Sequence, residues 1–393
     1  MLDTIAALVF WTSAALVAYA YVGYPLLIYV LGRLRRRPTE RRDICPTVSL
    51  LVPAYNEGRM IRAKIENCLK LDYPRDRLEI LVASDGSTDA TGRVIAEATR
   101  AGRIRGVVFP ERRGKAAVLN DLVAMASGEI LVLSDATTMV EPGSIRAFVE
   151  NFADPRVGCV SGIYRLVASN GDSSAGPESL YWRYERFIRE SESRLGAMLG
   201  AHGALYSLRR ALFEPIPPGT RNEDFTLPIG ILMRGYRSIY ETRAIASEDS
   251  SEMTGFRRRV GLAAGNYQQL GPLVRMRGWL RNPFVLFELL SHKILRLLSP
   301  FLMLAAYGAS ALLLEHPFYA TAFVAQTVFM IAALLGVRAP WRRRVGVLIA
   351  APYYFCMVNA AGVIALHRVV RRNGHAAPRL EDRNRDVAAP RAA

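Results

Sequence analysis

Cysteine is scarce in this sequence of 393 residues, which contains four cysteines. Cys45, Cys68, Cys159 and Cys356 form no CxxC pair and have no other spacing typical of metal ligands. Isolated cysteines of this kind are typical of small buried hydrophobic side chains in a reducing compartment. The cysteines therefore indicate no metal chemistry.

A glycine-rich phosphate loop is also missing where the first strong apolar run ends. Residues 48–57 read VSLLVPAYNE, an apolar strand pattern that stops at Pro53 and gives way to polar residues. A nucleotidyltransferase with a comparable sheet normally has a glycine-rich loop near its first strand, so this class is disfavoured. A membrane-anchored nucleotidyltransferase is kept as an alternative, as is a non-catalytic membrane protein with a degenerate domain of the same fold.

Acidic residues are fewer than basic ones: the sequence has 35 Asp and Glu and 51 Lys and Arg, which gives a formal charge of +16. Such a charge could indicate nucleic-acid binding. The arginines, however, cluster beside apolar segments, where they are typical of the cytoplasmic flanks of membrane helices. We therefore predict a membrane protein that does not bind nucleic acid.

Charged residues are missing from the stretch Ile5–Leu31, which is long enough to cross a bilayer with tilt. The preceding MLDT has no basic residue and the run is too long for a cleaved signal peptide, so we predict a retained transmembrane helix. A basic cluster follows and places the next part of the chain in the cytoplasm by the positive-inside rule. Its members are Arg33, Arg35, Arg36, Arg37, Arg41 and Arg42.

Three more charge-free spans are predicted near the C-terminus, at Leu297–Leu314, Phe318–Val337 and Val345–Leu366. Polar residues inside them are few, mainly Gln326 and Asn359, which disfavours a transporter or receptor. Three crossings would place the tail outside, whereas Arg368, Arg371 and Arg372 indicate the inside. One span could be re-entrant or interfacial, with a break at Pro352.

Between the membrane segments, apolar strand patterns alternate with helical ones. This alternation predicts an α/β domain with a parallel sheet covered on both faces. Asp85 and Asp135 follow two of these strands, at the sheet edge where such folds bind ligands. The strands are expected at Thr47–Ala54, Leu78–Ser84, Ile104–Phe109 and Ile130–Ser134, and the helices at Gly58–Leu71, Asp89–Ala101 and Lys115–Ala126.

The segments VSLLVPAYNE, LEILVASDGSTDAT and LVLSDATTMV together resemble the family-2 glycosyltransferases with a GT-A fold, in particular their membrane-embedded polysaccharide-synthase branch. The resemblance covers roughly residues 45–270. It implies a Rossmann-like, mostly parallel sheet and inverting transfer of a sugar from a nucleotide sugar, UDP-linked, to a growing polysaccharide or a lipid-linked acceptor. It also implies the bacterial inner (plasma) membrane, a cytoplasmic catalytic domain, contact with membrane lipid, and an export partner or homo-oligomer.

The resemblance assigns the donor site to the first strand ends. Asp85 would accept the N–H of a uracil edge, and Pro53, Tyr55 and Glu57 would line the nucleoside pocket with it. Lys115 matches a basic residue that the family places near the nucleotide. A first-turn surface lysine is the alternative interpretation of Lys115.

Asp135 matches the first position of the family's Asp-x-Asp motif, whose carboxylates bind a divalent cation between the phosphates. Thr137 occupies the second position, so the motif keeps one carboxylate. Mg²⁺ or Mn²⁺ suits such oxygen ligands, and a hydroxyl can ligate or orient a water. We predict metal dependence, weakened by Thr137.

Asp224, together with Glu223, matches the family's Glu-Asp pair, in which the Asp is the catalytic base. An acceptor hydroxyl that attacks an anomeric carbon needs such a base opposite the leaving diphosphate. The segment also suits an N-terminal helix cap, and both roles can coexist. Gly203 and His202 match an acceptor-binding segment, and His202 is better interpreted as a structural or sugar-contacting residue than as a catalytic one.

Arg259 lies in FRRRV, where processive members of the family carry Gln-x-x-Arg-Trp. The missing Gln and Trp remove a stacking platform, although Arg259 could still neutralise the diphosphate. The alternative is the basic face of an interfacial helix. The predicted regions are an N-terminal transmembrane helix at 1–32, a GT-A domain at 45–255, interfacial amphipathic helices at 256–296, a transmembrane region at 297–366, and a basic tail of disordered composition at 367–393.

Overall fold

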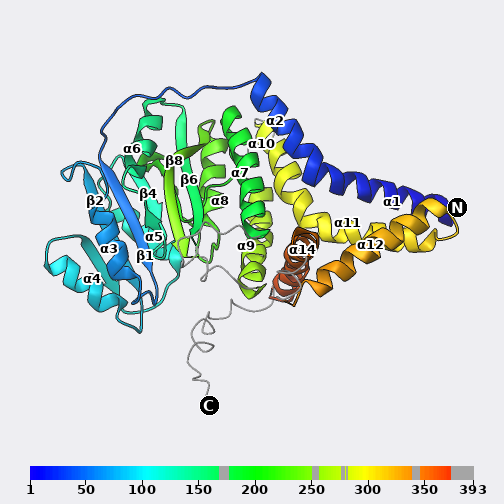
Figure 1. Ribbon diagram of the computed structural model, residues 1–393. Coiled ribbons are helices and arrows are strands. Elements are labelled where there is room, and N and C mark those ends of the chain that lie inside the picture. Colours follow the sequence, from blue (N-terminus) through cyan, green and yellow to red (C-terminus); the bar gives the residue numbers. More distant parts are fainter. Residues whose placement is uncertain (168–176, 250–255, 276–278, 280–281, 339–345, 373–393) are drawn as a thin grey trace, which may run out of the picture.

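An α/β domain lies beside a set of long helices that project away from it (Figure 1). The computed structural model describes residues 1–167, 177–249, 256–275, 279, 282–338 and 346–372. The predicted disordered tail began at residue 367, which is too early, because the helix Val347–Arg372 continues through the first residues of this segment. The rest of the predicted tail lies outside the described residues.

The sheet has eight strands in the order β3-β2-β1-β4-β7-β6-β8-β5. β1 pairs in parallel with β2 and β4, and β2 with β3, as predicted. β7 runs antiparallel between β4 and β6, and β5 runs antiparallel to β8, so the sheet is mixed. Besides the predicted strands, β6 and β8 also pair in parallel. The strands are β1 (Val48–Ala54), β2 (Leu78–Asp85), β3 (Arg105–Phe109), β4 (Ile130–Ser134), β5 (Met139–Val140), β6 (Val157–Val167), β7 (Leu205–Arg209) and β8 (Arg237–Asp249).

Helices cover both faces of the sheet, which explains why β1 and β4 are apolar on both sides. Leu50 of β1 packs into a core with α3, α4 and α6, whereas Leu51 packs on the opposite face with α5 and α8. The helices of this domain are α3 (Ile61–Leu69), α4 (Thr91–Arg100), α5 (Lys115–Met125), α6 (Ser144–Val149), α7 (Pro177–Leu195) and α8 (Glu223–Met233).

The ends of three strands lie at one edge of the sheet. Ala54 of β1 pairs with Ser84 of β2, and Leu51 of β1 pairs with Leu133 of β4. Because these strands are parallel, Asp85 and Asp135 both emerge at this edge. We call it the strand-end site.

The helix α9 (Phe256–Arg275) connects the α/β domain to the long helices. Its Val260 and Tyr267 pack against Ala361 and Ala365 of α14 (Val347–Arg372). On the same side of the domain, α7 packs against α2 (Tyr24–Leu34). The basic end of α14 therefore lies next to a helix that adjoins the α/β domain.

Four helices in the described residues are long and apolar enough to cross a membrane: Leu2–Leu34, Pro283–Leu312, Pro317–Leu335 and Leu348–Arg371. One N-terminal span and three C-terminal spans were predicted. The predicted break between an interfacial segment ending at Arg296 and a span starting at Leu297 is wrong, because one helix runs through it. This helix comprises α10 (Pro283–Glu288), a π-helical turn (Leu289–Ile294) and α11 (Leu295–Leu312); the other long helices are α1 (Leu2–Ala18), joined to α2 by a π-helical turn (Tyr19–Gly23), and α12 (Pro317–Leu335).

Candidate functional site

Asp85 anchors a loop at the strand-end site. Its Oδ1 accepts the backbone N–H of Arg113 at 2.7 Å, and its Oδ2 accepts that of Gly114 at 2.9 Å. The side chain is buried at 4% exposure. Each carboxylate oxygen can accept a second hydrogen bond, so the predicted contact with a base edge is compatible with this anchoring role.

Glycines at two positions allow the loop of residues 110–114 to approach Asp85. Gly114 has φ +93°, a conformation that side chains with a Cβ disfavour, and it immediately precedes α5. Gly86 has φ +61°, and a Cβ there would lie 2.4 Å from the backbone nitrogen of Arg112. The same loop places the Arg112 guanidinium 3.9 Å from the centre of the Tyr55 ring. Arg112 was not among the predicted site residues, although it lies in the basic segment ERRGK.

Lys115 joins the two acidic parts of the site. Its Nζ donates to Asp135 Oδ1 at 2.7 Å and to Glu223 Oε1 at 2.6 Å. These two ion pairs argue against the alternative interpretation of Lys115 as a surface lysine. Burial opposes its charged form, but the carboxylates of Asp135 and Glu223 outweigh burial and raise the pKa of Lys115 above its usual range. The chain of contacts from Asp85 through the loop to Lys115 therefore brings the predicted acids together.

Asp224 is the second residue of α8 and lies next to this ion-pair cluster. In the part of the chain that the structure describes, its carboxylate has no hydrogen-bond or ion-pair partner. Desolvation and the neighbouring Glu223 carboxylate raise the pKa of Asp224 to about 7. A carboxylate that titrates near neutral pH and is not engaged by a cation can accept a proton from a substrate.

The capping interpretation of this segment is supported in part. Asn222 holds the N-cap position of α8 but makes no side-chain capping bond. Its Nδ2 instead donates to Asn266 Oδ1 of α9 at 2.8 Å, while Gln269 Nε2 donates to the Asn222 carbonyl at 2.8 Å. Glu223 and Asp224 lie in the first turn, where negative charge suits the helix dipole. Contacts from α9 thus hold the start of the helix that carries the predicted base.

The predicted acceptor segment lies against Asp224. A Cβ at Gly203 would lie 3.1 Å from Asp224 Oδ2, so the missing side chain keeps the carboxylate open. The His202 ring stacks on Tyr164, with ring centres 4.3 Å apart and planes 11° apart, and it also contacts Trp182. This aromatic setting is typical of a structural or sugar-contacting histidine.

A carboxylate that sequence analysis missed lies beside the incomplete Asp-x-Asp motif. Thr137 Oγ1 donates to Glu248 Oε1 at 2.7 Å, and the Tyr164 hydroxyl donates to Glu248 Oε2 at 2.6 Å. Glu248 belongs to β8, whose pairing with β5 brings it next to the motif. The only sequence signal was an acidic pair at the end of a strand, which is not specific.

Oxygen donors from Asp135, Thr137 and Glu248 suit a hard divalent cation in chemical type. The described residues contain no group of three His, Cys, Asp or Glu side chains arranged to enclose a metal by themselves. Phosphate and water oxygens would have to complete the coordination, as is usual for Mg²⁺ at phosphate sites.

Two of the remaining predicted donor-site residues lie near the end of β1, and the third lies elsewhere. Pro53 lies in β1 opposite Ala83, and the backbone N–H of Glu57 donates to Thr91 Oγ1 at 2.8 Å. The Arg259 guanidinium lies over the ring of Tyr354 in α14, 4.5 Å from its centre. Pro53 and Glu57 thus lie near the end of β1, whereas Arg259 contacts Tyr354 on the side of the long helices.

Comparison with known proteins identifies the domain. Residues 49–216 match the model of the family described as Glycosyl transferase family 2. The chain carries a family-2 glycosyltransferase domain. Its sequence is 28% identical over 245 residues to a poly-beta-1,6-N-acetyl-D-glucosamine synthase of Staphylococcus aureus, covering 60% of this chain. The corresponding protein of Staphylococcus epidermidis is 27% identical over 57% of this chain.

The alignments span 58% and 55% of the length of these two curated relatives. Among solved structures, a mannosyltransferase from Pyrobaculum calidifontis, in complex with GDP-Man and Mn²⁺, is 25% identical with a TM-score of 0.72. That likeness covers 95% of this chain and 100% of the mannosyltransferase, so it includes the long helices as well as the family-2 domain.

Proposed function

We propose that this protein is an inverting, membrane-embedded glycosyltransferase that moves a sugar from a nucleotide sugar to a polysaccharide or lipid-linked acceptor. The observation that carries the proposal is the unpaired Asp224 carboxylate with a pKa of about 7, next to the ion pairs of Lys115 with Asp135 and Glu223. The family-2 domain supports the reaction class.

Asp224 is the proposed general base. The acceptor hydroxyl attacks the anomeric carbon of the donor, its proton passes to an Asp224 carboxylate oxygen, and the nucleoside diphosphate leaves from the opposite side. One displacement of this kind inverts the configuration at the anomeric carbon. Gly203 leaves space for the acceptor at Asp224, and the aromatic wall around His202 offers a stacking surface for its sugar.

Lys115 holds the carboxylates beside that base in place. Its ion pair with Glu223 fixes the carboxylate next to Asp224, and that neighbouring carboxylate is one cause of the raised Asp224 pKa. The loop anchored by Asp85 holds Arg112 over Tyr55, and its guanidinium is a candidate for offsetting diphosphate charge.

A divalent metal is proposed at Asp135, with Thr137 and Glu248 contributing to its surroundings. When bound, such an ion supplies positive charge that stabilises the departing diphosphate. Mg²⁺ and Mn²⁺ are both candidates, and Mn²⁺ is present in the Pyrobaculum mannosyltransferase structure. Glu248 provides the second carboxylate that the motif itself lacks.

The comparisons support a proposal for the donor class, and the apolar helices with their flanking arginines support one for the location. The curated relatives make an N-acetylglucosamine polymer, whereas the solved mannosyltransferase holds GDP-Man, so UDP-linked and GDP-linked sugars are the two donor candidates. We favour the UDP-linked class on the sequence resemblance. The four apolar helices and the arginines after the first of them support a bacterial plasma membrane location with the catalytic domain on the cytoplasmic face.

The test uses the purified full chain in detergent with UDP-N-acetylglucosamine, UDP-glucose and GDP-mannose in parallel. Release of nucleoside diphosphate identifies the donor, and nuclear magnetic resonance of the product identifies the anomeric configuration. We expect release from one nucleotide class and an inverted product. Folded protein that releases no diphosphate from any donor, or that yields a retained configuration, would contradict the proposal.

A further inference from the structure

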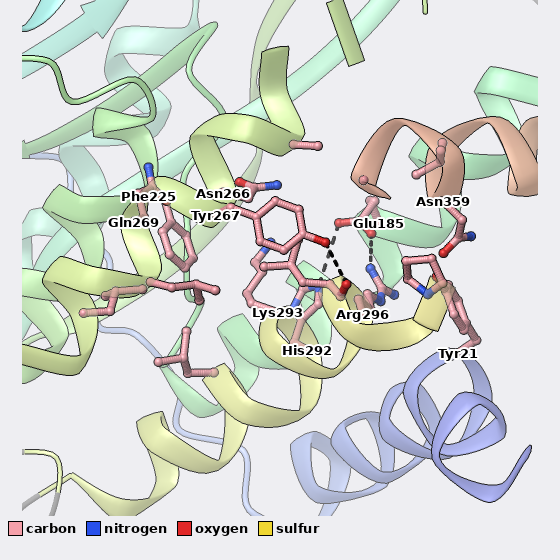
Figure 2. A pocket seen from close by; sticks show the side chains of 18 of the residues that line it. Tyr21, Glu185, Phe225, Asn266, Tyr267, Gln269, His292, Lys293, Arg296 and Asn359 are labelled. Atoms are coloured by element: carbon pink, nitrogen blue, oxygen red, sulfur yellow. Dashed lines mark hydrogen bonds and ion pairs between the residues drawn. The ribbon is translucent and has the colours of Figure 1, made fainter. Parts of the chain in front are cut away.

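A second cavity lies where the family-2 domain meets the membrane-spanning helices (Figure 2). It has a volume of about 170 Å³. Phe225 of α8 and Gln269 of α9 line its domain side, whereas Lys293, Arg296 and Asn359 come from the long helices. Because Phe225 directly follows Asp224, this cavity reaches the helical turn that carries the proposed base.

Two carboxylates on α7 already have cationic or imidazole partners here. Glu185 Oε1 accepts from Arg296 Nη1 at 2.5 Å, and Glu192 Oε1 lies 2.6 Å from His292 Nδ1. Arg296 Nη2 also donates to the Tyr184 hydroxyl at 2.9 Å. These contacts give Glu185 and Glu192 their partners, and the Lys293 ammonium group takes no part in them.

Lys293 is the basic side chain that faces the cavity without a direct partner. Within the described residues its ammonium group makes no hydrogen bond or ion pair, and it lies 5.6 Å from the centre of the Phe225 ring. A nearby donor, Arg296 Nε, is buried and also lacks a hydrogen-bond partner. A buried donor without an acceptor costs free energy, so a ligand with several acceptor oxygens would satisfy Arg296 Nε as well as the Lys293 ammonium group.

The remaining wall of the cavity is apolar and continuous with the membrane-spanning helices. Leu297 and Pro300 of α11 and Val358 of α14 line it, together with Leu270 and Leu273 of α9. A ligand that matches both parts is an amphiphile with an anionic head and a hydrocarbon chain. The volume is below the roughly 300 Å³ of common small-molecule sites, which suits a compact headgroup.

We propose that this cavity binds the phosphate headgroup of a lipid, with Lys293 as its main cationic contact. The catalytic consequence rests on the proposed function: the acceptor would reach Asp224 while attached to a lipid phosphate. Phosphate brings several acceptor oxygens to the ammonium group and to Arg296 Nε, and the hydrocarbon chain extends along α11 and α14. A neutral saccharide would leave the Lys293 charge unpaired.

The test measures binding to the full chain in detergent by native mass spectrometry, without nucleotide sugar. The probes are farnesyl phosphate, farnesol, dihexanoylphosphatidic acid and chitotetraose. Lys293→Gln is compared with Lys293→Arg, which keeps the charge, and with Lys70→Gln, which makes the same change at an exposed lysine at the end of α3. Melting temperatures without probe check that each variant is folded.

Binding of farnesyl phosphate but not farnesol, weakened at least about tenfold by Lys293→Gln and kept by Lys293→Arg and Lys70→Gln, would support the inference. Preference for farnesyl phosphate over the phosphatidic acid would identify a phosphate-linked acceptor lipid, and equal binding would identify bulk membrane phospholipid. Equal binding of farnesol, binding of chitotetraose alone, or no effect of Lys293→Gln would overturn it. Because no donor is present, this result is independent of whether glycosyl transfer is demonstrated.

Discussion

The strand-end site and the cavity at the membrane side are built on the same electrostatic plan with opposite charges. In the first, Lys115 is shared by two carboxylates, and Asp224 is left unpaired. In the second, Arg296 and His292 engage the carboxylates of α7, and Lys293 is left unpaired. Partnered groups hold each site in shape, while the unpaired group is available to a substrate. The difference in sign assigns proton transfer to one site and anion binding to the other.

The largest expected effect is that of Asp224→Asn, which removes the unpaired carboxylate from the strand-end site. We expect the transfer rate to fall by about 10²–10⁴-fold, the range for loss of a general base, because the amide cannot accept the proton. Asp76→Asn is the matched control, since the Asp76 side chain is 81% exposed and its ion pair is with the neighbouring Arg77. Initial rates at saturating donor measure both variants. Equal rates for Asp224→Asn and the wild type would exclude Asp224 as the base.

The next largest effect is expected from Glu248→Gln, which tests whether β8 completes the incomplete Asp-x-Asp motif. We expect Mn²⁺ affinity in the presence of nucleoside diphosphate to fall by about 10–100-fold, as for other groups around a metal. Electron paramagnetic resonance of free Mn²⁺ measures this without turnover. Thr137→Asp added to Glu248→Gln should restore affinity, because it supplies the missing carboxylate within the motif. Unchanged affinity in Glu248→Gln would remove this residue from the metal's surroundings.

The pH dependence of transfer should follow the ionisation of Asp224. Because its pKa is raised to about 7, the base is protonated at lower pH, and the rate should fall about tenfold per pH unit below that value. The same shift makes the ionised form costly to the folded state, so the stability from this group is lost progressively as pH rises from about 4 to about 7 and changes little above that. Asp224→Asn should abolish this loss of stability, which urea unfolding at pH 5 and pH 8 can measure. A flat rate profile between pH 5 and 8 would contradict the assignment.

The smallest expected effect is that of Gly114→Ala on the loop held by Asp85. An alanine at φ +93° is strained by about 1–3 kcal/mol, so we expect lower stability and donor affinity reduced by several-fold. Gly143→Ala is the control, because Gly143 has φ −79° and open space around the position of a Cβ. Thermal unfolding and donor titration would show the difference. Equal behaviour of the two variants would mean that the loop does not depend on this glycine.

Local patterns predicted the half of the site that lies at strand ends. β1, β2 and β4 are buried apolar runs that stop at polar residues, so their common edge and the positions of Asp85 and Asp135 follow from periodicity. Glu248 could not be predicted in this way, because it hydrogen-bonds to Thr137 across 111 positions through the β5–β8 pairing. Such long-range pairing leaves no periodic signal near either residue.

The membrane-side part was less predictable for an electrostatic reason. The helical amphipathicity of Pro283–Arg296 predicted an interfacial segment, yet the structure continues it into α11 as one membrane-spanning candidate. Arg296 is accommodated because α7 supplies Glu185, more than 100 residues earlier in the chain. A basic residue near a membrane helix thus indicates an interfacial position only where no acidic partner is brought to it.

Isothermal titration of a nucleotide sugar in the presence of Mn²⁺ into Asp85→Asn, Asp135→Asn and Asp224→Asn tests the central claim most directly. The claim is that one pocket holds the donor at the strand ends and the base on α8 beside it. We predict weakened donor binding in Asp85→Asn and Asp135→Asn, and near wild-type binding in the inactive Asp224→Asn. Wild-type binding in the first two variants, or its loss in Asp224→Asn alone, would contradict the shared pocket.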